Sequence, residues 1–170
     1  MCEGLSKVYD VMREFGSQRD YNGNRVVHVG DMQNNGPARR VLCDLADLSR
    51  GLVSKWYGEE HLVESVFLGR LGEGDRIEPH FDNTRLDGKI PNHTSQRSHS
   101  SLFYLSEDFE GGEIVFPKQG LSVKPETGMY VSFPASPPYL HYVTPVRRGA
   151  RYSTTVWFTQ QEGSRLKARV

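Results

Sequence analysis

Apolar residues in the first third of the chain recur at three- and four-residue steps, the period of an amphipathic helix. The first such stripe lies within residues 5–15 and predicts a short helix that ends at Gly16. A second helix is expected to begin at Pro37, whose fixed φ suits the first helical position, and to end at Gly58. Gly51 lies inside it and costs about 1 kcal/mol relative to alanine, so any kink would fall there.

After residue 60 the pattern changes to short apolar or alternating runs separated by Gly, Pro, Asp and Asn. Such runs, without a helical period between them, are typical of an antiparallel sandwich or barrel. The expected strands are 64–70, 76–82, 98–105, 113–117, 121–124, 128–133, 141–147 and 151–159, with a lone strand at 25–29. The predicted fold class is therefore mainly β, with N-terminal helices and a jelly-roll core.

The length of 170 residues is that of a single domain. We expect a helical support (1–60), a β core (61–160) and a C-terminal tail (161–170). Lys plus Arg and Asp plus Glu each number 21, so bulk charge indicates neither a nucleic-acid nor a membrane partner. No run approaches 18 apolar residues, and the 2 cysteines do not make a disulfide framework. These features predict a cytoplasmic location.

Two candidate metal ligands lie two residues apart on the expected strand 76–82. His80 and Asp82 would project from the same face of that strand, where they could bind one ion together. Such a pair is common by chance, so a third ligand is required. His141, at the start of a later expected strand, would complete the set of two histidines and one carboxylate that is typical of non-haem Fe(II).

A candidate anion-binding residue follows ten residues after His141. Arg151 begins the last expected strand, which we place beside the strand of His141 across a turn at 147–149, with both side chains in one cavity. Its guanidinium could bind a carboxylate bidentately. Ser153 and Trp157 share its face, the first as a hydroxyl donor and the second as the cavity floor. Either an internal Asp or Glu or a bound diacid must meet this buried charge.

An ordered set of motifs resembles the prolyl-hydroxylase branch of the Fe(II)- and 2-oxoglutarate-dependent oxygenases. The set consists of His80-x-Asp82, Phe103-Tyr-Leu-Ser-Glu-Asp-Phe-Glu-Gly-Gly-Glu-Ile-Val-Phe-Pro117, Gly128-Met-Tyr-Val-Ser-Phe133, and His141 with Arg151. The Tyr-Leu-x-x-Asp-Phe-Glu-Gly-Gly run and the closing Val-Trp-Phe-Thr are similar to the leprecan-type prolyl 3-hydroxylases. The Arg-Tyr-x-x-Thr-Val-Trp strand is also close to the oxygen-sensing prolyl hydroxylases.

This resemblance implies a double-stranded β-helix core in which His80, Asp82 and His141 hold Fe(II). It implies that Arg151 binds the distal carboxylate of the cosubstrate 2-oxoglutarate, that O₂ is consumed, and that ascorbate is a candidate additional cofactor. Decarboxylation of 2-oxoglutarate to succinate and CO₂ would accompany hydroxylation of a C–H bond. Asp82 favours hydroxylation over halogenation, because related halogenases lack this carboxylate.

One position departs from the oxygen-sensing relatives, which carry a tyrosine where Phe103 falls. A hydrogen bond to 2-oxoglutarate is therefore either absent or supplied by Ser101 or Ser153. The loop Asn83–Arg97 is either a solvated connection or a substrate lid. The pair Gly111-Gly112 is expected to form a tight turn with positive φ.

The expected activity is hydroxylation of a prolyl residue in a peptide or protein. A free amino acid or a peptide-like small molecule is the alternative substrate. Two further interpretations stay open. Nucleic-acid demethylation uses the same ligand set but is disfavoured by the zero net charge. A non-catalytic β-barrel module would use the histidines and Asp82 only to bind a structural metal.

Overall fold

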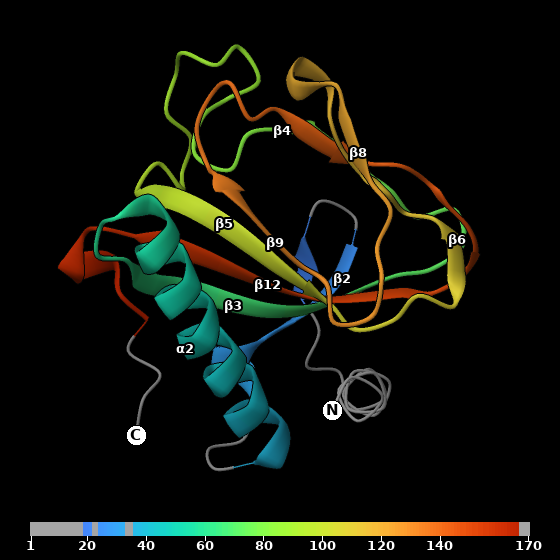
Figure 1. Cartoon of the computed structure of the whole chain (residues 1–170), viewed down its shortest axis with the longest axis horizontal. Coiled ribbons are helices and arrows are strands. Elements are labelled where there is room, and N and C mark those ends of the chain that lie inside the picture. The colour runs from blue at the N-terminus through green and yellow to red at the C-terminus, as the bar shows by residue number, and fades with distance from the viewer. Residues whose placement is uncertain (1–18, 22–23, 33–35, 167–170) are drawn as a thin grey trace.

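The computed structural model describes residues 19–21, 24–32 and 36–166 as two facing β-sheets, a short ribbon and one long helix (Figure 1). The larger sheet has six strands in the order β1-β2-β3-β12-β5-β9, all antiparallel to their neighbours. Its strands are β1 (Arg19–Tyr21), β2 (Asn24–His28), β3 (Leu62–Leu71), β12 (Arg151–Thr159), β5 (Arg97–Tyr104) and β9 (Tyr130–Pro134).

The smaller sheet has four strands in the order β4-β10-β7-β8, and a two-stranded ribbon pairs β11 with β6. These strands are β4 (Ile77–His80), β10 (His141–Val143), β7 (Ile114–Phe116), β8 (Leu121–Val123), β11 (Val146–Gly149) and β6 (Phe109–Gly111). Three short 3₁₀ turns, η1 (Val29–Asp31), η2 (Pro117–Gln119) and η3 (Glu162–Ser164), complete the described elements. Two packed sheets of this kind form the predicted jelly-roll core.

The long helix α2 (Pro37–Tyr57) covers one face of the larger sheet (Figure 1). It begins at Pro37, continues through Gly51, and ends at Gly58, whose left-handed φ of 72° closes the last turn. Its inward side packs with the outer face of the sheet in one apolar core. That core comprises Val27, Val29, Met32, Leu42, Ala46, Val53, Val66, Leu68, Phe103, Leu105, Val156 and Phe158. No helix within the described ranges has the length and apolar character needed to cross a membrane.

The other face of the larger sheet packs against the smaller sheet through a second apolar cluster. This cluster comprises Leu102, Tyr104, Ile114, Phe116 and Phe133. A third cluster, Leu71, Phe109, Val143 and Val146, closes the end of the sandwich beside the β11-β6 ribbon. Successive residues of a strand point to opposite faces, so β12 sends Val156 and Phe158 toward α2 and sends Ser153 and Trp157 between the sheets.

Several expected elements differ in the structure. The strand at 25–29 is not alone, because β2 pairs with both β1 and β3. The expected strand 76–82 ends at His80, and the expected strand 141–147 divides into β10 and β11. Pro145 lies at that division, where a proline has no N–H to donate to a ladder. Residues 147–149 belong to β11 and are not the expected turn. The helix expected at 5–15 lies outside the described residues.

Gly111 and Gly112 have the expected positive φ values, 79° and 68°. A Cβ atom added at Gly111 would lie 2.1 Å from the carbonyl oxygen of Pro145, where β6 approaches the start of β11. Only a residue without a side chain fits that approach, so the glycine pair closes the ribbon that leads into β12.

Gly111→Ala is therefore expected to lower the free energy of unfolding by about 3 kcal/mol or more, because a backbone clash adds to the cost of the left-handed φ. Gly120→Ala is the matched control, since Gly120 has a φ of 62° but no atom within 4 Å of an added Cβ. It should cost only about 1–2 kcal/mol. Urea unfolding of both variants measures the difference, and equal costs would contradict the clash.

Candidate active site

Three of the predicted site residues converge between the two sheets. His80 ends β4 and His141 begins β10, and the two residues are direct partners in the antiparallel ladder. The Nε2 atom of His80 lies 3.8 Å from Oδ1 of Asp82, and Nε2 of His141 lies 3.8 Å from Oδ2. The three ligand atoms lie within 4.8 Å of one another. Asp82 lies beyond the end of β4, so the loop after the strand, and not the strand itself, positions its carboxylate.

Each imidazole is oriented by a hydrogen bond to the backbone carbonyl oxygen of the residue two positions earlier. Nδ1 of His80 lies 2.8 Å from the carbonyl oxygen of Glu78, and Nδ1 of His141 lies 3.0 Å from that of Tyr139. A carbonyl oxygen only accepts, so each Nδ1 carries the proton and each Nε2 presents its lone pair toward Asp82. Fixing the tautomer in this way prepares both rings to bind a metal ion.

The protonation states also suit a metal ion. Burial lowers the pKa of His141, and the neighbouring His80 adds to this effect, while Asp82 opposes it. The pKa of Asp82 is also lowered. Burial alone would raise it, but the two histidines, a hydrogen bond from Ser100 and the charge of Arg97 together outweigh that effect. A neutral His141 beside an ionised Asp82 is the state that a divalent cation requires.

Asp82 is held from several sides. The Ser100 hydroxyl donates to Oδ2 of Asp82 at 2.6 Å. The backbone N–H of Asp82 donates to the carbonyl oxygen of Ala135 at 3.1 Å, and its own carbonyl oxygen accepts from the Thr94 hydroxyl at 2.7 Å. Thr94 lies in the loop Asn83–Arg97, so this loop anchors the backbone of Asp82.

Arg151 reaches the same cavity from the opposite sheet. It begins β12, whose neighbours are β3 and β5, so its strand does not lie beside that of His141 as expected. The side chain is 2 % exposed, and its Nη1 donates to the Ser153 hydroxyl at 3.2 Å. Its Nε and Nη2 atoms are buried without a hydrogen-bond partner.

No carboxylate among the described residues pairs with Arg151. We expected the buried charge of Arg151 to be met either by an internal Asp or Glu or by a bound diacid. The described part of the chain contains no Asp or Glu that pairs with it. A bound carboxylate would accept hydrogen bonds from the two buried donor nitrogens, Nε and Nη2, and would balance the charge of the guanidinium.

One cavity of about 80 Å³ connects the metal-ligand set to Arg151. Trp157 lines it, and the guanidinium carbon of Arg97 lies 4.0 Å from the centre of the Trp157 ring. Ser153 also lines the cavity. Most of the remaining wall is apolar, from Val26, Phe67, Leu71, Ile77, Leu102, Ile114, Phe133 and Val143.

Of the two serines that could supply a hydrogen bond to 2-oxoglutarate, Ser153 lines the cavity and Ser101 does not. Ser101 does not line the cavity, because its hydroxyl lies 2.6 Å from that of Ser49 on α2. Phe103 shares that outward face. Their neighbours Ser100 and Tyr104 point between the sheets, and the Tyr104 ring centre lies 4.9 Å from the guanidinium carbon of Arg151.

Tyr104 therefore lies beside Arg151. It directly follows Phe103, the position at which we expected the tyrosine of the oxygen-sensing relatives to be missing. Its hydroxyl is buried without a hydrogen-bond partner, like the two nitrogens of Arg151. Gly112 was also not assigned to the site, yet an added Cβ there would lie 3.0 Å from Cδ of Arg151. The strand-to-strand turn thus keeps room for the guanidinium.

Comparison with known protein families identifies the class of this fold and site. Residues 66–159 match the 2OG-Fe(II) oxygenase superfamily, which is more than half of the chain. The chain belongs to this superfamily, whose members use Fe(II), 2-oxoglutarate and O₂.

Several proteins with similar sequences are named as prolyl hydroxylases. Prolyl 3-hydroxylase 2 of Rattus norvegicus is 30% identical over 144 residues, which cover 71% of this chain and 20% of that protein. Probable prolyl 4-hydroxylase 3 of Arabidopsis thaliana is 34% identical over 116 residues, covering 49% of this chain and 38% of that protein. The chain thus spans about a fifth of the length of the prolyl 3-hydroxylases it matches.

Solved structures share the fold. The viral collagen prolyl hydroxylase of Paramecium bursaria Chlorella virus-1 superposes with a TM-score of 0.71 at 18% identity, covering 95% of this chain and 92% of that one. A prolyl-4-hydroxylase of Pseudomonas putida gives a TM-score of 0.70 at 21% identity, with coverages of 94% and 86%. Both the predicted fold class and the predicted family are confirmed.

The residues of this chain fit the cofactor and cosubstrate of the superfamily. The two available imidazole nitrogens and one carboxylate would hold Fe(II), and the unsatisfied N–H groups of Arg151 would hold a carboxylate of 2-oxoglutarate. Bound iron and 2-oxoglutarate supply the oxidising chemistry, and the protein supplies ligands, orientation and exclusion of water.

Ser100→Ala should weaken Fe(II) binding by about 10- to 100-fold, because it removes the hydroxyl that orients the Asp82 carboxylate. The same loss raises the pKa of Asp82, so protons should compete with iron at a higher pH than in the wild type. Anaerobic Fe(II) titration between pH 5 and 8 measures both effects. Ser101→Ala, on the opposite face of the strand, is the control, and equal affinities for the two variants would contradict this role of Ser100.

Arg151→Lys should raise the KM for 2-oxoglutarate about tenfold or more, because an ammonium cannot replace the planar pair of donors. Succinate formation as a function of 2-oxoglutarate concentration measures this change. Arg148→Lys is the control, since Arg148 is exposed on β11 and pairs with Glu110 at the surface. An unchanged KM in Arg151→Lys would show that this guanidinium does not bind the cosubstrate.

Proposed function

We propose that this chain hydroxylates a prolyl residue in a peptide or protein, using Fe(II), 2-oxoglutarate and O₂. The observation that carries the proposal is the convergence of His80, Asp82 and His141 with the unsatisfied guanidinium of Arg151 in one cavity. Similarity to named prolyl 3- and 4-hydroxylases supports the choice of proline. A related fold from Trichoplax adhaerens is described in complex with a peptide fragment, which supports a peptide substrate.

Each part of the chain has a distinct role in this proposal. Arg151 and Ser153 bind and orient the distal carboxylate of 2-oxoglutarate. Ser100 and the two backbone carbonyls fix the ligand atoms, so that little reorganisation is needed when the metal binds. The apolar wall excludes water from the reacting groups.

A free amino acid or a peptide-like small molecule is the alternative substrate. The two substrates differ in what must lie beside the iron, because a chain segment needs an open groove and a small molecule suits a closed pocket. A panel that contains proline peptides, free proline and other amino acids therefore separates these alternatives.

The test is anaerobic loading with Fe(II), followed by O₂-started turnover of 2-oxoglutarate in the presence of that panel. Succinate formation should increase with a proline peptide, and mass spectrometry should show a gain of one oxygen atom on it. Asp82→Ala should abolish turnover, whereas Asp44→Ala, an exposed carboxylate on α2, should not. Wild-type rates in Asp82→Ala would refute the metal assignment, and stimulation only by free amino acids would favour the alternative substrate.

A further inference from the structure

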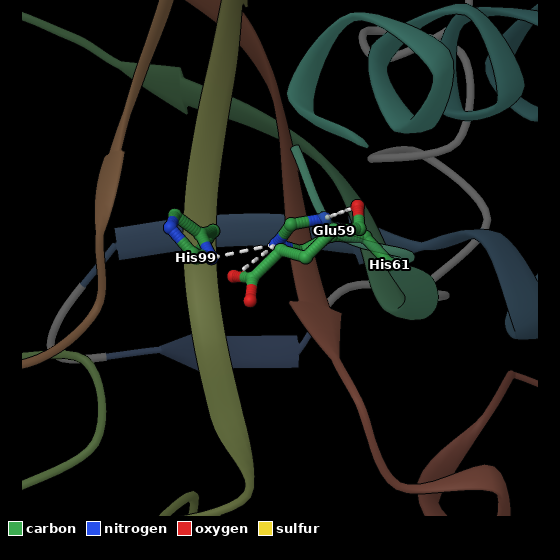
Figure 2. A group of neighbouring side chains, drawn as sticks. All are labelled: Glu59, His61 and His99. Carbon is green, nitrogen blue, oxygen red and sulfur yellow. Dashed lines mark hydrogen bonds and ion pairs between the residues drawn. The ribbon is translucent and has the colours of Figure 1, made fainter. Parts of the chain in front are cut away.

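A second group of potential metal ligands lies outside the active site. Figure 2 shows Glu59, His61 and His99 close together, with the carboxylate and the two imidazoles facing one another. Glu59 follows the Gly58 cap of α2, His61 precedes β3, and His99 lies in β5. One ligand atom from each residue lies within 4.8 Å of the others, the same limit that the active-site triad meets.

This group lies on the opposite face of β5 from the active-site cavity. Ser100 points to Asp82 between the sheets, so the preceding His99 points toward α2. The His99 ring packs 4.1 Å from the ring of Tyr57, and the His61 ring packs 6.0 Å from that of Phe158 in the core beneath the helix. The two ligand groups are therefore separate sites on either side of one sheet.

The tautomer of His61 is fixed as it is in the active-site histidines. Its Nδ1 lies 3.0 Å from the carbonyl oxygen of Glu59, two residues earlier, so Nδ1 carries the proton. Its Nε2 then presents a lone pair, which lies 2.8 Å from Nδ1 of His99 and 3.5 Å from Oε1 of Glu59. His61, His80 and His141 thus share one tautomer, and the last two are the histidines of the candidate iron site.

The burial of the two histidines also suits a metal ion. His61 is 0% exposed and His99 is 7% exposed, and burial, with the neighbouring His61, lowers the pKa of His99 to about 4. The His99 ring is therefore neutral at pH 7. The Glu59 side chain is 45% exposed, so its carboxyl group approaches the buried pair from the solvent side.

We propose that Glu59, His61 and His99 bind a divalent transition-metal ion of the Zn²⁺ type. Two imidazole nitrogens and one carboxylate oxygen are a ligand set that zinc accepts, with water in the fourth position. The ion replaces the hydrogen bond between the two rings. His99 moves its proton from Nδ1 to Nε2, and the two nitrogens separate to roughly 3.3 Å, the spacing in a tetrahedral zinc site. Neither imidazole changes its net charge.

The bound ion has a structural consequence. It joins the end of α2 to β5, beside the serine that holds Asp82. A ligand that binds only the folded state stabilises that state by RT ln(1 + L/Kd), where L is the free ligand concentration, so the stabilisation grows with the logarithm of L once L exceeds Kd. Zinc therefore stabilises the helix-to-sheet junction without entering the active site.

The test uses Zn²⁺ titration of the Asp82→Ala protein, in which the active-site triad lacks its carboxylate. Calorimetry should show one site per chain, and the melting temperature should rise by several degrees with Zn²⁺. Adding Glu59→Gln should weaken binding about tenfold or more, because it removes a charged ligand. Glu60→Gln, an adjacent exposed carboxylate outside the group, should leave the affinity unchanged.

Nitrogen-detected NMR of the imidazoles in the same Asp82→Ala protein identifies the ligands without substituting either His61 or His99. Zn²⁺ should shift the resonances of His61 Nε2 and His99 Nδ1. Shifts confined to His80 and His141 would mean that residual binding occurs in the active site, and would overturn the proposal. Absence of Zn²⁺ uptake, or equal affinities for Glu59→Gln and Glu60→Gln, would overturn it as well.

Discussion

The buried guanidinium of Arg151 is the constraint on which the interior of this protein depends. A charged group that is 2 % exposed, with two donor nitrogens unsatisfied by the described residues, is costly unless an anion meets it. The surroundings supply one hydroxyl, from Ser153, and an aromatic face, from Tyr104. In the proposed function the partner of this positive charge is 2-oxoglutarate, which would link the stability of the interior to binding of the cosubstrate.

Strand β12 couples this site to the rest of the fold. One of its faces supplies Arg151, Ser153 and Trp157 to the cavity, and the other supplies Val156 and Phe158 to the core beneath α2. Because alternate residues of one strand serve both purposes, the core beneath the helix and the cavity share the backbone of β12. The helix is therefore a support for the site, although none of its residues lines the cavity.

The sequence predicted the ligand set and the sheet-rich fold, because residue identity and spacing are visible in it. His80, Asp82, His141 and Arg151 converge as expected. Sequence could not show which face of β5 points inward, since both faces of this strand are buried and carry serines and large side chains. That single ambiguity explains why Ser101 was chosen in place of Ser100. The partners of β12 depend on long-range pairing, which local pattern does not encode.

The direct ladder pairing of His80 with His141 has a consequence for how such chains diversify. The two ligands are brought together by strand register, so the length of chain between them does not set their separation. Insertions or deletions in intervening loops that do not hold Asp82 can change the surface around the cavity while the two histidines keep their places. A family built on this pairing can therefore acquire new substrates by altering loops alone.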